Sequence, residues 1–198
     1  MLQYFENIKK SRHVLHMLVV RDVFSKYRKS LLGVAWSMIT PLSMVGVIGL
    51  VYSVVFGTPL IAFVPYLFSG LTPWLFISGA IDSGTSSYIA AEGFITQTKI
   101  HTEIFPLRMV LVAFVNYLFM SIAFFIVYAL IKPDAFNLNM LLYIPSSIII
   151  FIFCWGVANI VALINLYIRD YAYLQSILLQ ILFYITPLIY SPELMDKR

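Results

Sequence analysis

Long stretches without a charged residue alternate with short polar segments along this chain. Five of the stretches contain 21 to 29 residues, and a helix needs about 20 apolar residues to cross a bilayer. They lack the alternation of apolar and polar residues that marks the strands of a membrane barrel. The pattern therefore predicts an all-α integral membrane protein with spans at about 34–56, 65–86, 109–131, 144–168 and 171–191.

Prolines place two of the expected helix starts. We expect the second helix to begin near Pro65. The fourth run is too long for one perpendicular span, and we place its start at Tyr143 or Ile144, because Pro145 is tolerated in a first helical turn.

Composition excludes an ordinary soluble enzyme. Hydrophobic residues make up 61% of the 198 residues and charged residues 11%, against about 45–50% and about 25% in soluble domains. The single cysteine, Cys154, excludes an internal disulfide and a cysteine-built metal site.

The positive charges predict the orientation in the membrane. The net charge of +4 does not indicate nucleic-acid binding, because seven of the 13 Lys and Arg residues precede residue 30. With a cytoplasmic N-terminus, ten of the 13 fall on the inner side and three on the outer side. The positive-inside rule favours this topology, in a plasma membrane or bacterial inner membrane.

The first 30 residues have the features of a helix at the membrane interface. Leu15, Val19, Val23 and Tyr27 recur at intervals of four and share one helical face. One interpretation is a cytoplasmic amphipathic helix over residues 1–30 with its cations toward anionic headgroups. The other is a positive-inside anchor without a further role. The aromatic and basic residues on both sides of the membrane boundary favour the interfacial helix.

The segment 88–108 is too long for a tight turn and mixes polar with apolar residues. A short amphipathic helix that docks a soluble partner and a solvated loop fit this pattern equally well.

Most polar residues inside the predicted spans are explained by structural roles rather than by ligand binding. Asp82 is followed by small polar residues, which places it at the wet end of its span. The charged pair Arg169-Asp170 has two interpretations. It is a membrane stop signal, or it is a functional element that acts as a hinge or as a second partner contact. Three asparagines are expected to hydrogen-bond between helices rather than bind a ligand: Asn116, Asn159 and Asn165.

Aromatic residues are abundant, at 16% of the chain. Belts at the two membrane interfaces are the better-supported interpretation for most of them, including Trp36, Tyr52 and Tyr190. Others could line a path for sugar-bearing cargo: Tyr66, Trp74, Phe76 and Tyr88.

Catalytic and nucleotide-binding motifs are absent from the sequence. It has no phosphate-binding GxxxxGK[ST] loop and no GxSxG elbow, and its three histidines form no plausible metal set. A transporter energised by a partner or an ion gradient is therefore favoured over a membrane enzyme. A glycan- or acyl-transferring enzyme would need convergent acid–base groups, for which Asp82, Glu92 and Glu103 are the candidates.

A family resemblance is carried by motifs in a fixed order. Arg21-Asp22 precedes Lys26 and the run to Gly33, then Trp36 and Pro41; Asn165, Arg169-Asp170, Pro187 and Tyr190 follow near the end. This order resembles the ABC-2 type permeases, and more narrowly the branch that exports lipid-linked polysaccharides such as O-antigen, capsule and teichoic acid. An ABC-2 drug or antibiotic exporter is the alternative within the family.

The resemblance implies an architecture and partners. It implies an interfacial helix, six spans and a homodimeric channel, driven by a separate ATP-binding subunit that carries the ATP and Mg. The permease itself would bind no cofactor. The cargo would be an undecaprenyl-diphosphate-linked glycan. Only five spans are found, so we expect this chain to be C-terminally truncated, with a sixth span beyond Arg198.

The resemblance also assigns roles to residues. The residues implied to couple the permease to the ATPase are Glu92, Phe94, Ile95, Gln97, Lys99, His101 and Glu103. Those implied to bind the lipid diphosphate are Arg21, Lys26, Arg28 and Lys29, and those of the structural motifs are Gly33, Trp36, Pro41, Arg169, Asp170 and Pro187. The four aromatic residues Tyr66, Trp74, Phe76 and Tyr88 would line the channel.

Overall fold

A computed structural model describes residues 2–28, 30, 32–57, 59–133 and 137–188 of the protein. The regular elements in this part of the chain are all helices, which confirms the predicted all-α fold class. They are α1 (Leu2–Lys10), α2 (Arg12–Tyr27), η1 (Gly33–Ala35), α3 (Trp36–Phe56), α4 (Leu60–Thr85), α5 (Ser87–Ala90), α6 (Glu92–Gln97), α7 (Ile104–Ile131), η3 (Leu138–Leu142), α8 (Tyr143–Tyr167) and α9 (Tyr171–Ile185).

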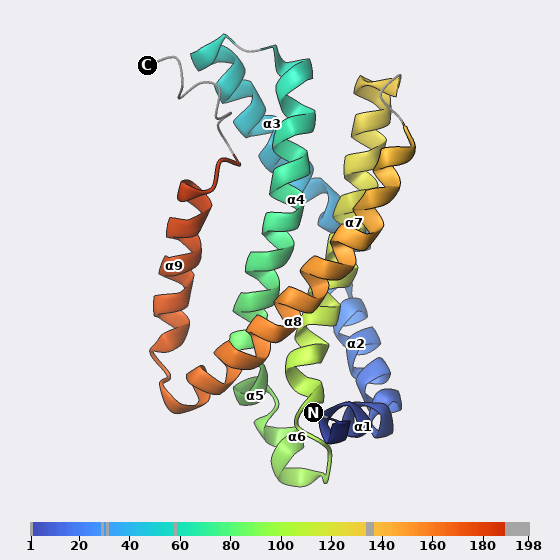
Figure 1. Ribbon diagram of the computed structural model, residues 1–198, viewed down its shortest axis with the longest axis vertical. Coiled ribbons are helices and arrows are strands. Elements are labelled where there is room, and N and C mark those ends of the chain that lie inside the picture. Colours follow the sequence, from blue (N-terminus) through green and yellow to red (C-terminus); the bar gives the residue numbers. More distant parts are fainter. Residues whose placement is uncertain (1, 29, 31, 58, 134–136, 189–198) are drawn as a thin grey trace.

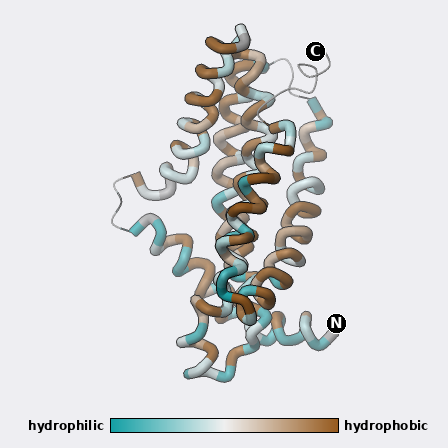
Figure 2. The backbone as a smooth tube through the Cα atoms, turned by 90° about the vertical axis from the view of Figure 1, so that its left-hand side faces the viewer, coloured by the Kyte–Doolittle hydropathy of each residue, from teal (hydrophilic) through white to brown (hydrophobic). Residues whose placement is uncertain are grey.

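Four of the described helical segments are long and apolar enough to cross a membrane: those of α3, α4, α7, and η3 with α8. The apolar helix α9 is shorter, with 15 residues. In Figure 1 these helices run alternately up and down, while α1 lies across the lower end beside α6. Figure 2 shows hydrophobic residues along the long helices and hydrophilic stretches in the N-terminal helices.

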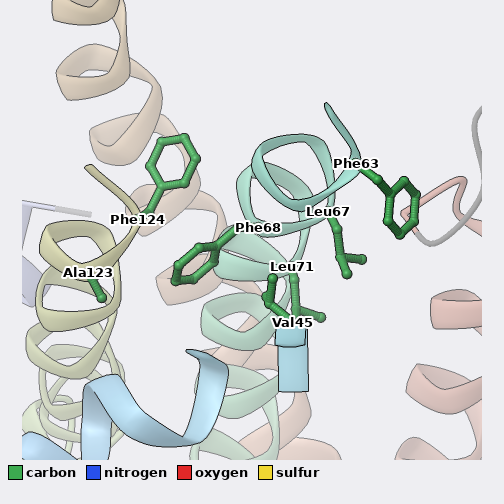
Figure 3. Packing of buried hydrophobic residues seen from close by; sticks show 7 residues of the cluster. All are labelled: Val45, Phe63, Leu67, Phe68, Leu71, Ala123 and Phe124. Carbon is green, nitrogen blue, oxygen red and sulfur yellow. The ribbon is translucent and has the colours of Figure 1, made fainter. Parts of the chain in front are cut away.

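Helix α4 is the centre of the bundle, because it packs against α3, α7, α8 and α9. In its first half, Phe63, Leu67, Phe68 and Leu71 recur at helical spacing and are buried. They form one core cluster with residues of α3 and α7, among them Phe124 (Figure 3).

The second half of α4 belongs to a separate core cluster between α7 and α8. Phe76 and Ala80 pack there against Tyr117 on α7 and against Cys154 and Ala158 on α8. The first cluster thus joins α4 to α3 and α7, and the second joins it to α7 and α8. The outward faces of α8 and α9 carry large apolar side chains that are more than half exposed, as expected of surfaces that meet lipid.

Some predicted helix starts are confirmed and others are wrong. Helix α8 begins at Tyr143, as predicted. Helix α4 begins at Leu60 rather than near Pro65, because Pro59 occupies the N-cap position and Pro65 is accommodated inside the helix. Helix α7 begins at Ile104, so the last five residues of the segment 88–108 are helical and continuous with the third span.

The N-terminal region consists of two helices, so the prediction of one helix over residues 1–30 is wrong. The chain bends at the buried Ser11, between α1 and α2. The reason is tertiary, because α1 is held across the end of the bundle by side-chain hydrogen bonds to Glu103, just before α7, and to Asn159 of α8. Lys29 and the residues after Leu188 lie outside the described part of the chain.

Candidate functional site

The candidate site lies at the end of the bundle where α1, α2, α5 and α6 meet the start of α7 (Figure 1). An apolar cluster joins these elements. Leu15 and Leu18 of α2 pack against Ile104, Phe105 and Leu107 at the start of α7. The apolar face predicted for the N-terminal region therefore contacts the protein itself at these positions.

Helix α1 is bonded to two other parts of the site. The Asn7 amide donates a hydrogen bond to Glu103 Oε1 at 2.9 Å, and the Tyr4 hydroxyl donates to Asn159 Oδ1 on α8 at 3.0 Å. Burial raises the pKa of the Tyr4 hydroxyl, so it remains a donor at neutral pH. The pKa of the Glu103 carboxyl is lowered overall. Partial burial acts to raise this pKa, but the hydrogen bond from Asn7, a backbone hydrogen bond and the nearby His101 together outweigh the effect of burial.

A buried ion pair attaches α2 to α7. The Arg108 side chain is only 8% exposed, and its Nε and Nη2 atoms lie 2.6 and 2.5 Å from Asp22 Oδ2. Sequence reasoning ended the predicted coupling segment at Arg108 because a charge interrupts the apolar run. Asp22 neutralises that charge, which is why Arg108 can be buried within the helix that begins at Ile104. The partners are 86 positions apart, and nothing in the local pattern identified them.

The residues predicted for ATPase coupling are spread over α6 and the turn after it. Glu92, Gln97 and Lys99 are exposed. Phe94 and Ile95 are half-buried against the apolar cluster, and His101 and Glu103 are also half-buried. The guanidinium of Arg21 lies over the Phe94 ring, 5.4 Å from its centroid, and so ties α2 to α6.

A cavity separates α5 and α6 from the C-terminal end of α8. It has a volume of about 410 Å³ and is lined by Tyr88, Glu92 and Arg169 together with apolar side chains. Burial raises the pKa of the Tyr88 hydroxyl. Arg169 and Asp170 are exposed, and Asp170 occupies the N-cap position of α9.

A groove opens between α2, α3, α4 and α7, and we call it the α2–α3 groove. Its volume is about 410 Å³. Lys26 supplies its positive charge and Trp36 its aromatic surface, while Pro41 lies at its wall. Hydroxyl and amide groups complete the lining: Ser37, Thr40, Ser83 and Asn116. Ser37 donates to Asn116 Oδ1 at 3.1 Å, so these two also join α3 to α7.

The predicted lipid-diphosphate residues do not share one site. Arg21 and Arg28 line a depression of about 380 Å³ with Phe24 and Ser25, whereas Lys26 lines the α2–α3 groove. Because a helix turns by 100° per residue, Lys26 projects to a different side of α2 from Arg21, and Arg28 follows the end of the helix. The sequence cluster of cations is thus divided between two surfaces.

The predicted aromatics also occupy different environments. Trp74 lines a cavity of about 260 Å³ between α3, α4 and α9, and Tyr66 is exposed and donates to the Pro187 carbonyl at 2.8 Å. Phe76 is 1% exposed and packs against Phe114 and Tyr117. Its ring therefore belongs to the core of the protein and does not line a cargo path.

Gly33 has a role in the backbone. Its φ of +50° lies in the left-handed region, which favours glycine. It stands at the start of η1, in the short link between α2 and α3.

A polar network that sequence reasoning missed joins the C-terminal parts of α4 and α8 to the first half of α9. The buried Gln175 of α9 accepts a hydrogen bond from the Thr85 hydroxyl and donates to Asp82 Oδ1 at 3.1 Å. Asn165 of α8 donates to the Thr85 carbonyl at 3.0 Å. The available signal was Gln175 itself, a polar residue within an apolar run.

The three asparagines behave as predicted. Each bonds to another helix: Asn116 to α3, Asn159 to α1 and Asn165 to α4. Their amides hold helices together, as small polar groups do within membrane bundles.

The fold defines the class of the protein: an all-α integral membrane protein with several apolar helices. Its sequence is 25% identical over 190 residues to the O-antigen export system permease protein RfbA of Klebsiella pneumoniae, covering 94% of this chain and 73% of that protein. The RfbA permease of Myxococcus xanthus is also 25% identical over 190 residues, covering 96% and 73%. A second Klebsiella pneumoniae RfbA is 26% identical over 193 residues. No protein-family profile matches the chain.

These similarities extend over nearly the whole chain and confirm the resemblance to O-antigen export permeases that the ordered motifs predicted.

Proposed function

We propose that the chain is the membrane permease subunit of an ATP-binding-cassette exporter that moves a lipid-linked polysaccharide out of the cytoplasm. The observation that carries the proposal is the similarity to three O-antigen export permeases over 94 to 96% of this chain. The apolar helices supply a multi-pass membrane domain. In this proposal the chain transports and a separate subunit hydrolyses ATP.

Complementation tests the proposal. The full-length product of the source gene, expressed with the ATP-binding subunit of its source, is expected to restore surface polysaccharide in a strain that lacks an O-antigen export permease. The polysaccharide is measured by immunoblotting of intact cells. Membrane insertion without restored polysaccharide, combined with resistance to an added antibiotic, would instead support a drug exporter.

The distribution of charge supports a cytoplasmic N-terminus. Apart from Lys132, the described cations lie on α1, on α2 or directly after it, in the segment 87–108 or in the connection between α8 and α9, and Lys132 follows α7 at the opposite end (Figure 1). A cation-rich end is the cytoplasmic end by the positive-inside rule. The ATP-binding subunit would therefore meet α5, α6 and the turn that follows.

Within that surface, α6 is the proposed contact with the ATP-binding subunit. Glu92, at its first position, is exposed and makes no ion pair among the described residues. Its reversal, Glu92→Lys, is expected to reduce both the binding of the ATP-binding subunit and polysaccharide export severalfold while the permease stays folded. Binding is measured by co-purification from membranes.

The control for this prediction is Glu6→Lys, which reverses an exposed carboxylate on α1. It should leave binding and export at the parent level. Equal losses from both variants would show that net charge, and not the α6 surface, matters. Glu103 is a poor choice for such a test, because its carboxylate accepts the hydrogen bond from Asn7.

The α2–α3 groove is the proposed binding site for the anionic head of the lipid carrier. Lys26 offers a charge, and the exposed Thr40 hydroxyl lies in the same wall, which also has aromatic and apolar surface. A cation near an anionic membrane surface contributes about 1 kcal/mol. Lys26→Gln should therefore weaken binding of a lipid diphosphate about fivefold, as measured by titration of a fluorescent polyprenyl diphosphate in nanodiscs.

Lys9→Gln is the matched control, because Lys9 is exposed on α1 and does not line the groove. It should change the affinity less than Lys26→Gln does. The same loss in both variants would mean that cations act through the general surface potential, and the groove would not be the site.

A homodimeric channel is the remaining part of the proposal. The cavity beside Trp74, between α3, α4 and α9, gives these helices an aromatic inner surface. A second copy would close this side of the bundle.

A further inference from the structure

The Asp22–Arg108 pair fixes the position of α2 on α7. A guanidinium as buried as that of Arg108 requires a counter-charge, because an unpaired charge is costly to remove from water. Asp22 is the acidic residue that supplies it, and both Arg108 contacts converge on one carboxylate oxygen. The apolar contacts of Leu15 and Leu18 hold the first half of α2, and the ion pair holds the second half.

Helix α2 is joined to α3 by a short link that includes Gly33 at positive φ. The α2–α3 groove lies across this junction, with Lys26 on α2 and Trp36 and Thr40 on α3. The position of α2 on α7 thus determines where the charged wall of the groove stands. Lys26 follows Asp22 by one helical turn, so a tilt of α2 about Asp22 moves Lys26.

The same helix is in contact with the segment proposed to meet the ATP-binding subunit. Arg21, next to Asp22, covers the Phe94 ring of α6. A displacement of α6 would therefore be transmitted to α2 at the residue that precedes the ion pair.

We propose that Asp22 and Arg108 are a positioning pair, which holds α2 so that the opening of the α2–α3 groove follows the movement of α6. The pair does not contact the cargo; it acts through the placement of Lys26. The link to α6 rests on the proposed transport function, whereas the control of the groove by the pair does not.

The test measures access to the groove directly. Thr40 is exposed in the groove wall, and Thr40→Cys in a Cys154→Ala background places one thiol there. The rate of its reaction with a methanethiosulfonate reagent is measured on the full chain in nanodiscs. Asp22→Asn should raise this rate severalfold, and the exchanged pair Asp22→Arg with Arg108→Asp should return it toward the parent value.

Arg12→Asp is the matched control, because it alters an exposed charge on α2 outside the groove and should leave the rate unchanged. The parent rate in a monodisperse Asp22→Asn variant would overturn the proposal, and so would an exchanged pair that folds but keeps the raised rate. If Asp22→Asn does not fold, the labelling rate is measured in Asp22→Glu instead, because the longer glutamate side chain must displace α2. A raised rate supports the proposal and the parent rate contradicts it.

Export separates this inference from the proposed function. If the parent exports polysaccharide with its ATP-binding subunit, Asp22→Asn should lower the glycan exported per ATP hydrolysed, whereas Arg12→Asp should not. If the parent exports nothing, the proposed function fails, but the labelling rates still decide whether the pair controls the groove.

Discussion

Replacing Gly84 with alanine is expected to destabilise the bundle by about 1–3 kcal/mol, the range typical of overpacked cores. A Cβ atom at Gly84 would lie 2.7 Å from the Cβ of Ala158 and 3.2 Å from its Cα. Neither atom can move without a shift of α8. The variant should unfold at a lower SDS fraction in an SDS titration followed by circular dichroism.

Gly79→Ala is the control for the Gly84 substitution, because it lies on the same helix and its added Cβ would meet nothing within 4 Å. The double variant Gly84→Ala with Ala158→Gly moves the methyl group to the other helix and should recover much of the lost stability. If the double variant is no more stable than Gly84→Ala, close approach of α4 and α8 is not the cause.

Truncation of Phe68 to alanine is expected to cost about 3 kcal/mol, the lower end of the range for buried phenylalanine. Phe68 is fully buried, and its ring packs edge-on against Phe124 of α7 with the centroids 5.7 Å apart (Figure 3). Lipid tails are as apolar as the core, so the loss comes from packing contacts rather than from exposure to water. The same SDS titration measures it.

The control for this prediction is Phe153→Ala on α8, whose side chain is 56% exposed on the outer surface. It should change the stability by less than about 0.5 kcal/mol. Similar effects of the two substitutions would mean that the cluster between α3, α4 and α7 does not hold the bundle together.

The helices were predictable because their cause is local. A run without charges must satisfy its own backbone hydrogen bonds in a bilayer, so its length and composition are sufficient to predict a helix. The start of α8 at Tyr143 follows from one proline in the first turn. The starts of α4 and α7 were harder to predict from the sequence, because a proline or a buried arginine inside a helix is tolerated when its surroundings compensate for it.

The candidate site was only partly predictable. The sequence singled out the cation cluster but not the surfaces that it meets, because only the packing of α2 against its neighbours shows that Lys26 lines the α2–α3 groove and the two arginines line a separate depression. Phe76 was predicted to line the channel, but its ring packs against Phe114 and Tyr117 and therefore lies in the core. A pattern shows that a residue is aromatic or charged, but not which neighbour covers it.

The sequence by itself determined the all-α membrane class and the resemblance to O-antigen export permeases, because apolar length and ordered motifs are properties of the linear chain. Only the tertiary structure decided that Asp22 neutralises Arg108, that Gln175 bonds to Asp82 and that α1 lies across the bundle end. The physical reason is distance along the chain. These partners are 86, 93 and 96 positions apart, and each is brought within hydrogen-bonding reach only by the packing of whole helices.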